Sequence, residues 1–219
     1  MNKKGLLAGA LVVVSVAAIS IGSTFALLKD TTEAKVNVFT AAAGLEGQLK
    51  EDAFDGCDYG VARPDTFTDE SLGIVKAQKV VPGRAIPKDP QVKNNSDASK
   101  GVSAWVAIKL EVKCDGKTGS DAMNEIKKFA DINFSDTWEA AADGITFYYK
   151  TAVAPQGETT ALFTTVTIKD DDTISVADIK DFELNPTAYL VQAEGAEGAT
   201  TLEAAKAMFA ATFPAVFGA

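Results

Sequence analysis

Alternation of apolar and polar residues is the strongest pattern in this chain, and it predicts β-strands. In residues 103–112 every second residue is apolar, while Lys109 and Glu111 lie among the residues of the opposite face. A period of two indicates a strand that buries one face. The apolar face comprises Ala104, Val106, Ile108, Leu110 and Val112.

The same pattern, bounded by Pro, Gly and Asp, predicts further strands. They are expected at residues 73–81, 91–94, 145–150, 162–168, 179–184 and 187–193. Ser120 is expected to cap a helix over 121–130, and Thr200 with Glu203 forms a capping box for a C-terminal helix. The apolar face of that helix comprises Leu202, Ala205, Phe209 and Phe213. Many short strands with few helices predict a mainly β fold, an antiparallel jelly-roll-like β-sandwich with short decorating helices.

Residues 1–26 have the organisation of a secretory signal peptide. Lys3 and Lys4 precede an uncharged run, and small residues at its end favour cleavage between Ala26 and Leu27. The run is also about as long as a membrane span, so an uncleaved anchor is the alternative. Cleavage would place the mature protein outside the cell.

Residues 27–40 then alternate as an amphipathic strand. One face carries Leu28, Thr32, Ala34, Val36 and Val38, with Asp30 as the only interruption. No tight turn follows, because residues 41–44 read Ala-Ala-Ala-Gly, so we expect no hairpin partner. A strand freed by proteolysis can complete the sheet of another molecule, as a donor strand, although it can also pack into its own sheet. The remaining residues, 41–219, are expected to form the jelly-roll domain.

Charge and cysteine content narrow the functional classes. The chain has 30 Asp and Glu against 21 Lys and Arg, which disfavours binding to nucleic acid and to anionic lipid. Cys57 and Cys114 are the only cysteines. In an oxidising compartment they could form a disulfide that ties down the irregular acidic loop 50–69, and the alternative is two unpaired thiols.

The sequence predicts neither an enzyme nor a cofactor. It contains no histidine, which excludes Ser-His-Asp and Cys-His machinery and histidine-based zinc motifs. The acidic pairs Asp69–Glu70 and Glu194 with Glu197 are interpreted as solvated surface. Residues 170–172, three consecutive Asp, could hold a hard cation but are more typical of a polar turn. Aromatic residues could form a sugar-stacking surface but are more often core; they are Trp105, Trp138, Phe147, Tyr148 and Tyr149.

Several short motifs, in this order, resemble the TasA/camelysin family, whose members are secreted through the dedicated signal peptidase SipW. They are the processing region 22–30, Asn-Val-Phe-Thr at 37–40, Gly-Leu at 44–45, Val-Pro-Gly at 81–83, Lys-Asp-Pro at 88–90 and Lys-Asn-Asn at 93–95. Downstream, residues 144–149, 162–163 and 189–193 are more similar to the clostridial BsaA-type branch, described as biofilm matrix proteins.

The resemblance implies a secreted jelly-roll subunit that polymerises with itself into extracellular matrix fibres, its freed N-terminal strand filling a groove in the next subunit. SipW and an accessory anchoring protein are the other expected partners. Two alternatives stay open, a camelysin-like metallopeptidase and a surface carbohydrate-binding sandwich. Lys29 and Lys35 on the polar face of the donor strand could form an intersubunit isopeptide bond if they became buried, or remain solvated charges.

Overall fold

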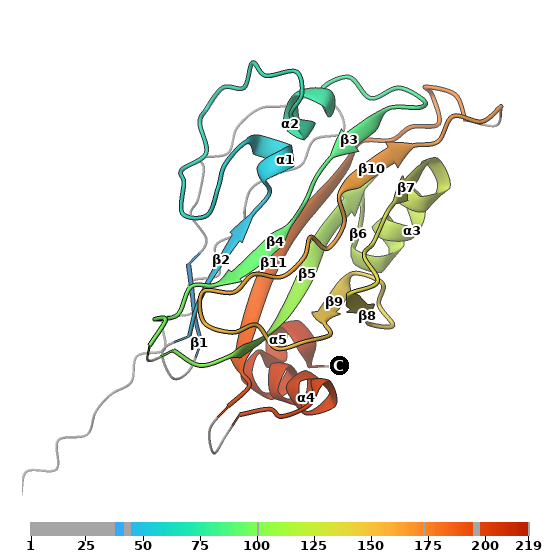
Figure 1. The fold of residues 1–219 in the computed structure, drawn as a ribbon. Coiled ribbons are helices and arrows are strands. Elements are labelled where there is room, and N and C mark those ends of the chain that lie inside the picture. The colour runs from blue at the N-terminus through green and yellow to red at the C-terminus, as the bar shows by residue number, and fades with distance from the viewer. Residues whose placement is uncertain (1–37, 42–44, 100, 173, 195–197, 219) are drawn as a thin grey trace, which may run out of the picture.

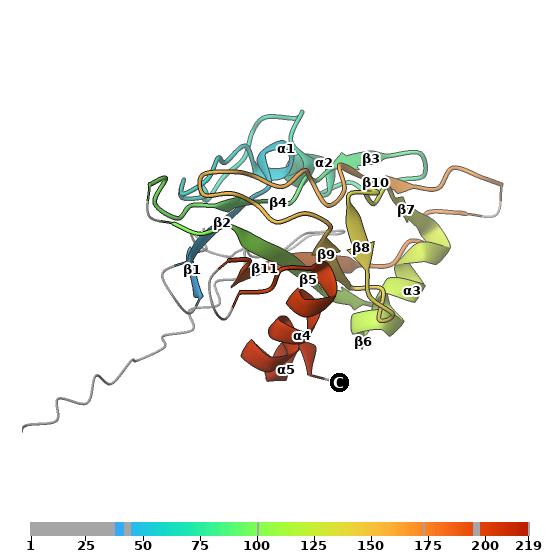
Figure 2. The ribbon, with the colours of Figure 1, turned by 60° about the horizontal axis from the view of Figure 1, so that its bottom comes forward.

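The computed structural model describes residues 38–41, 45–99, 101–172, 174–194 and 198–218 (Figure 1). Antiparallel strands in two layers, with a few short helices, make up this part of the chain, which confirms the predicted mainly β class (Figure 2). The expected signal peptide, its cleavage site at Ala26 and Leu27, and the donor residues Leu28, Thr32, Ala34 and Val36 lie outside the described residues. No helix in the described ranges is long and apolar enough to cross a membrane.

The front layer is built from two short sheets that the backbone joins. One has the order β1 (Val38–Ala41), β2 (Leu45–Lys50), β4 (Gln91–Asn94), and the other β3 (Ala85–Pro87), β10 (Thr165–Ile168), β7 (Ala130–Ile132). β3 leads directly into β4, and segment 157–164 runs alongside both. Backbone hydrogen bonds of 2.8–3.1 Å join this segment to β4 and to the turn that precedes it. They include those from the Thr159 N–H to the Val92 carbonyl and from the Lys88 N–H to the Thr164 carbonyl.

The back layer has the order β11 (Phe182–Gln192), β5 (Ala104–Cys114), β9 (Thr146–Tyr149), β8 (Trp138–Ala140), with β6 (Lys117–Thr118) also paired to β5. β5 and β11 pair along their whole length, from Cys114 opposite Phe182 to Ala104 opposite Gln192 (Figure 1). The five apolar residues predicted for one face of this strand are at most 1% exposed and belong to the main core, so that prediction is confirmed.

Five helices decorate the described strands: α1 (Asp52–Asp55), α2 (Gly73–Lys76), α3 (Gly119–Phe129), α4 (Leu202–Thr212) and α5 (Pro214–Phe217). α1 and α2 lie over the front layer, whereas α4 and α5 lie beneath the back layer (Figure 2). There, Phe209 and Ala205 pack on Trp105, Ala107 and Tyr148 in a second apolar cluster. The predicted apolar face of the C-terminal helix is therefore confirmed.

Two local predictions of strands were wrong. Residues 73–81, predicted as a strand, begin with helix α2, and buried Ile74, Ala77 and Val80 recur every third residue rather than every second. The two strands predicted at 179–184 and 187–193 form one strand, β11, which runs through Pro186. Proline is tolerated there because β11 is the terminal strand of its sheet in the described chain.

The helix caps also shift by one or two residues. Thr201, not Thr200, caps α4, since its hydroxyl accepts a hydrogen bond from the Ala204 N–H at 3.2 Å. Helix α3 begins after Thr118, and the Ser120 hydroxyl instead donates to the Asp143 carbonyl at 2.6 Å.

Candidate functional site

The N-terminal edge of the front layer is the first candidate site, because the proposed donor residues lead directly into it. Val38–Ala41 forms β1, which pairs with β2 of the same chain, Val38 opposite Gln48 and Ala41 opposite Leu45. The expectation that this part of the strand has no hairpin partner was therefore wrong. A connection of three residues, 42–44, is short enough for an antiparallel hairpin even without a turn motif such as Asn-Gly.

This edge also brings the two layers together. β1 ends the front layer and β11 ends the back layer in the described sheet order, and the two strands contact each other. Close to them, Gly47 of β2 faces Leu190 of β11, so closely that a Cβ on Gly47 would lie 2.6 Å from Leu190 Cδ1. Val38, the first described residue, therefore lies at the side of the sandwich where both layers end.

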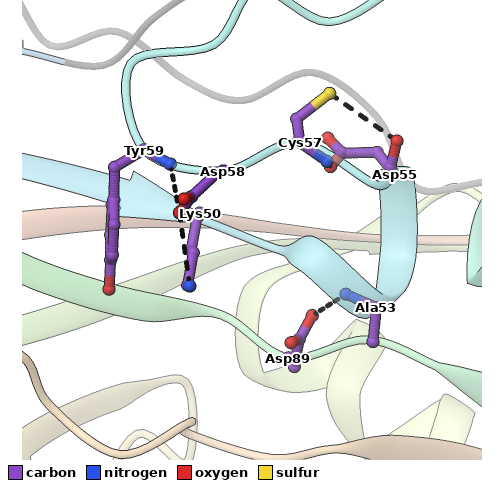
Figure 3. Close-up of polar contacts among 7 residues, drawn as sticks. All are labelled: Lys50, Ala53, Asp55, Cys57, Asp58, Tyr59 and Asp89. Atoms are coloured by element: carbon purple, nitrogen blue, oxygen red, sulfur yellow. Dashed lines mark hydrogen bonds and ion pairs between the residues drawn. The ribbon is translucent and has the colours of Figure 1, made fainter.

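The proposed disulfide is absent, because Cys57 and Cys114 are both free thiols. Cys57 follows α1, where its N–H donates to Asp55 Oδ1 at 3.0 Å and its Sγ lies 3.6 Å from the Asp55 carbonyl oxygen (Figure 3). Cys114 ends β5 opposite Phe182. Different elements hold the two thiols, and burial raises the pKa of each to about 11.

A buried group of charged side chains lies beneath α1, and the sequence patterns did not single it out. Glu51 and Lys88 are each 1% exposed, with Lys88 Nζ 2.6 Å from Glu51 Oε1. Asp55 is 5% exposed and faces Arg63, whose Nε lies 3.8 Å from Asp55 Oδ2. Burial raises the pKa of Glu51 and of Asp55 and lowers the pKa of Lys88. The Lys-Asp-Pro motif at 88–90 was the only signal that marked this place.

Side-chain contacts link the segment that carries this group to the front layer. Asp89 Oδ1 accepts a hydrogen bond from the Ala53 N–H at 2.8 Å, which ties the start of α1 to the turn between β3 and β4 (Figure 3). Lys50 Nζ lies 3.3 Å from Asp58 Oδ1 and 4.7 Å from the centroid of the Tyr59 ring. The predicted irregular loop is thus an ordered excursion held at its base.

The acidic candidates show no clustering for catalysis or metal binding. Asp69 accepts hydrogen bonds from the Ser71 N–H and hydroxyl, at 2.8 and 2.7 Å, which lower its pKa as in an ordinary polar turn. Glu194 accepts from the Ser103 N–H at 3.3 Å, and Glu197 lies outside the described residues. Over the described ranges, no group of three or more Cys, Asp or Glu could hold a metal ion.

Four of the five aromatic residues considered as a sugar-stacking surface are buried, and Tyr149 is half-buried. Trp105 and Trp138 are 8% and 4% exposed. Each indole N–H donates to a backbone carbonyl, that of Ala199 at 2.7 Å and that of Thr160 at 3.2 Å. Phe147 and Tyr148 are also buried.

An open groove of about 370 Å³ crosses the outer face of the back layer beside α5. Lys109, Glu111 and Lys113 of β5 contribute to its wall, together with Tyr189 of β11 and Val216 of α5. Lys109 Nζ donates to the Val216 carbonyl at 2.5 Å, so its charge is used to hold α5 on the sheet.

Comparison with known proteins finds no matching family model, no matching curated protein and no matching solved structure. The function of this chain has to be inferred from its own residues and geometry.

Proposed function

We propose that this chain is a secreted structural subunit that polymerises head-to-tail, by donor-strand complementation, into extracellular matrix fibres. The single observation that carries the proposal is the position of β1. It is a terminal strand of the front layer, and the amphipathic residues 27–37 lead directly into it. A donor strand has to be fixed to its own subunit at one end and available to another subunit at the other.

Pairing of β1 with β2 supplies the fixed end. Four residue pairs, from Val38–Gln48 to Ala41–Leu45, hold Val38–Ala41 in its own subunit. The donor strand is thereby shortened from residues 27–40 to residues 27–37, which span about 36 Å when extended. Val38 becomes part of the anchor, whereas Leu28, Thr32, Ala34 and Val36 remain the donor face.

Strand donation favours filaments over rings. Donor strand and acceptor groove are different surfaces, so the contact between subunits is heterologous. Such a contact need not close into a ring and can be repeated along an open filament. Main-chain hydrogen bonds give such a junction its affinity, and alternate apolar side chains give it its register. In this proposal the two layers form a jelly roll whose missing strand comes from the preceding subunit.

The signal peptide acts as a polymerisation block in this mechanism. Until cleavage between Ala26 and Leu27, the donor strand is held at the membrane, and secretion and activation are one event. SipW is the proposed peptidase, and an accessory matrix protein anchors the fibre at the cell surface.

Electron microscopy of the purified protein comprising residues 27–219 tests the proposal. Incubated alone, it is expected to form filaments. Protein that stays monomeric at high concentration would overturn the proposal, and chelator-sensitive cleavage of casein would favour the peptidase alternative.

A further inference from the structure

Glu51 and Lys88 stand at the two ends of the excursion that leaves β2 and returns into β4. Glu51 directly follows β2, and Lys88 lies between β3 and β4. Their side chains meet at the base of the excursion, where Nζ is 2.6 Å from Oε1. The neighbouring hydrogen bond from Ala53 to Asp89 holds the same two chain segments together (Figure 3).

The pair is closed off from water. Both side chains are 1% exposed, and Lys88 Nζ lies 4.1 Å from the centroid of the Phe54 ring. Loss of hydration raises the pKa of Glu51 and lowers the pKa of Lys88, against their mutual attraction. Both shifts favour the neutral forms, a carboxylic acid and an amine with a free lone pair.

The contact between the two groups is short but lacks the direction of a hydrogen bond. Within the described part of the chain, Glu51 Oε1 has no hydrogen-bond partner, even though Nζ is only 2.6 Å away. A buried ion pair is stable only when further hydrogen bonds offset the lost hydration of both charges. A close approach without such bonds therefore indicates two groups that can react with each other rather than a stable ion pair.

We propose that Lys88 and Glu51 condense into an internal amide bond between Nζ and Cδ. A proton first passes from the ammonium to the carboxylate, which gives an amine and an acid. The Nζ lone pair then forms the C–N bond, one C–O bond of the carboxyl breaks, and the hydroxyl leaves with a proton from Nζ as water. No oxidant, reductant or cofactor is needed.

Asp55 is the acid proposed to carry the proton from Nζ to the leaving hydroxyl. It is buried and acts electrostatically on both Glu51 and Lys88, and burial raises its own pKa. The product replaces two buried charges by a neutral amide, which removes the cost of burying them. It also closes the excursion covalently, which restricts the unfolded chain as a disulfide does.

Mass spectrometry of the purified monomer tests this proposal. The folded chain is expected to be lighter than its sequence requires by one water molecule, also after boiling in detergent and reductant. Tryptic digestion is expected to give a branched peptide that joins the segment starting at Glu51 to the segment starting at Ala85. Full mass, with the two segments recovered separately, would overturn the proposal, and this measurement requires no variant to fold.

Variants locate the bond. Lys88→Met and Glu51→Met replace a charged side chain by an apolar one of similar size, and both are expected to restore the full mass. Lys50→Met, next to Glu51 in the chain, is the matched control and is expected to keep the loss of water. A loss of water that persists in Lys88→Met would contradict the assignment. Fibre formation is a separate measurement, because the amide forms within one subunit.

Discussion

Gly73, the first residue of α2, lies directly against the backbone of Pro87 at the end of β3. A Cβ on Gly73 would come 1.8 Å from the Pro87 carbonyl oxygen and 2.7 Å from Phe54 Cδ2. This contact seats α2 on the front layer. Only glycine, which has no Cβ, can occupy this position without displacing that backbone.

Gly73→Ala is therefore expected to destabilise the protein by about 3 kcal/mol, because a backbone carbonyl cannot move aside as a flexible side chain can. Chemical denaturation followed by tryptophan fluorescence measures the loss. Gly144→Ala is the control. Gly144 has a φ of 67° but no atom within 4 Å of its added Cβ, so only backbone strain of about 1 kcal/mol applies. Equal losses in the two variants would contradict the packing role of Gly73.

Val36→Asp is expected to prevent fibre formation while the monomer stays soluble, because it buries an unpaired charge at every junction, at a cost of several kcal/mol. Asn37→Asp introduces the same charge one residue later, on the predicted polar face, and should still assemble. Sedimentation and electron microscopy distinguish the two. Normal fibres from Val36→Asp would show that the donor face is wrongly assigned.

A disulfide between β1 and β2 tests whether β1 remains with its own subunit. Thr40 and Glu46 are direct partners in the hairpin, so the double variant Thr40→Cys, Glu46→Cys can be oxidised in the monomer. The oxidised protein is expected to assemble as well as its reduced form. If oxidation stops assembly, the hairpin has to open, and the donor strand extends beyond residue 37.

A soluble tag fused before Leu27 is expected to suppress polymerisation, since it obstructs the entry of the strand into the next subunit. Light scattering after proteolytic removal of the tag should rise from the time of cleavage. Assembly at the same rate with and without the tag would contradict control by processing.

Cys57 and Cys114 are expected to resist alkylation in the folded protein. With the pKa of each thiol raised to about 11, only about one molecule in a thousand is a thiolate at pH 8. Iodoacetamide should therefore modify both cysteines only after unfolding. The unfolded thiols ionise near pH 8.5, so stability should also fall between about pH 8.5 and pH 11. Rapid labelling of the native protein would contradict the burial of these thiols.

Sequence patterns located the elements whose signal is local. The strand around Ile108 has an apolar residue at every second position and was placed within two residues of its ends, and the apolar face of α4 was identified from Ala205 and Phe209. The helix at Gly73 was missed because it spans only four residues, Gly73–Lys76, too few to show a helical period in the sequence. The β1–β2 hairpin was missed because residues 42–44 carry no turn motif.

The buried charges at Glu51 and Lys88 could not have been found by periodicity. Each residue lies in an acidic or mixed segment that is typical of a solvated loop, and burial comes only from the folding of the excursion over the front layer. For the donor residues, by contrast, the sequence predicts the element but not its partner. Their alternation indicates a strand, but alternation cannot identify the strand with which it pairs.

The long pairing of β5 with β11 determines how a subunit would respond to mechanical load. These strands are matched residue by residue over their full length of 11 residues each. A force directed along the strands is resisted by all of these pairs at once, whereas a force directed across them separates one pair after another. A subunit pulled along this axis within a filament would therefore unfold at a much higher force than the same subunit pulled sideways.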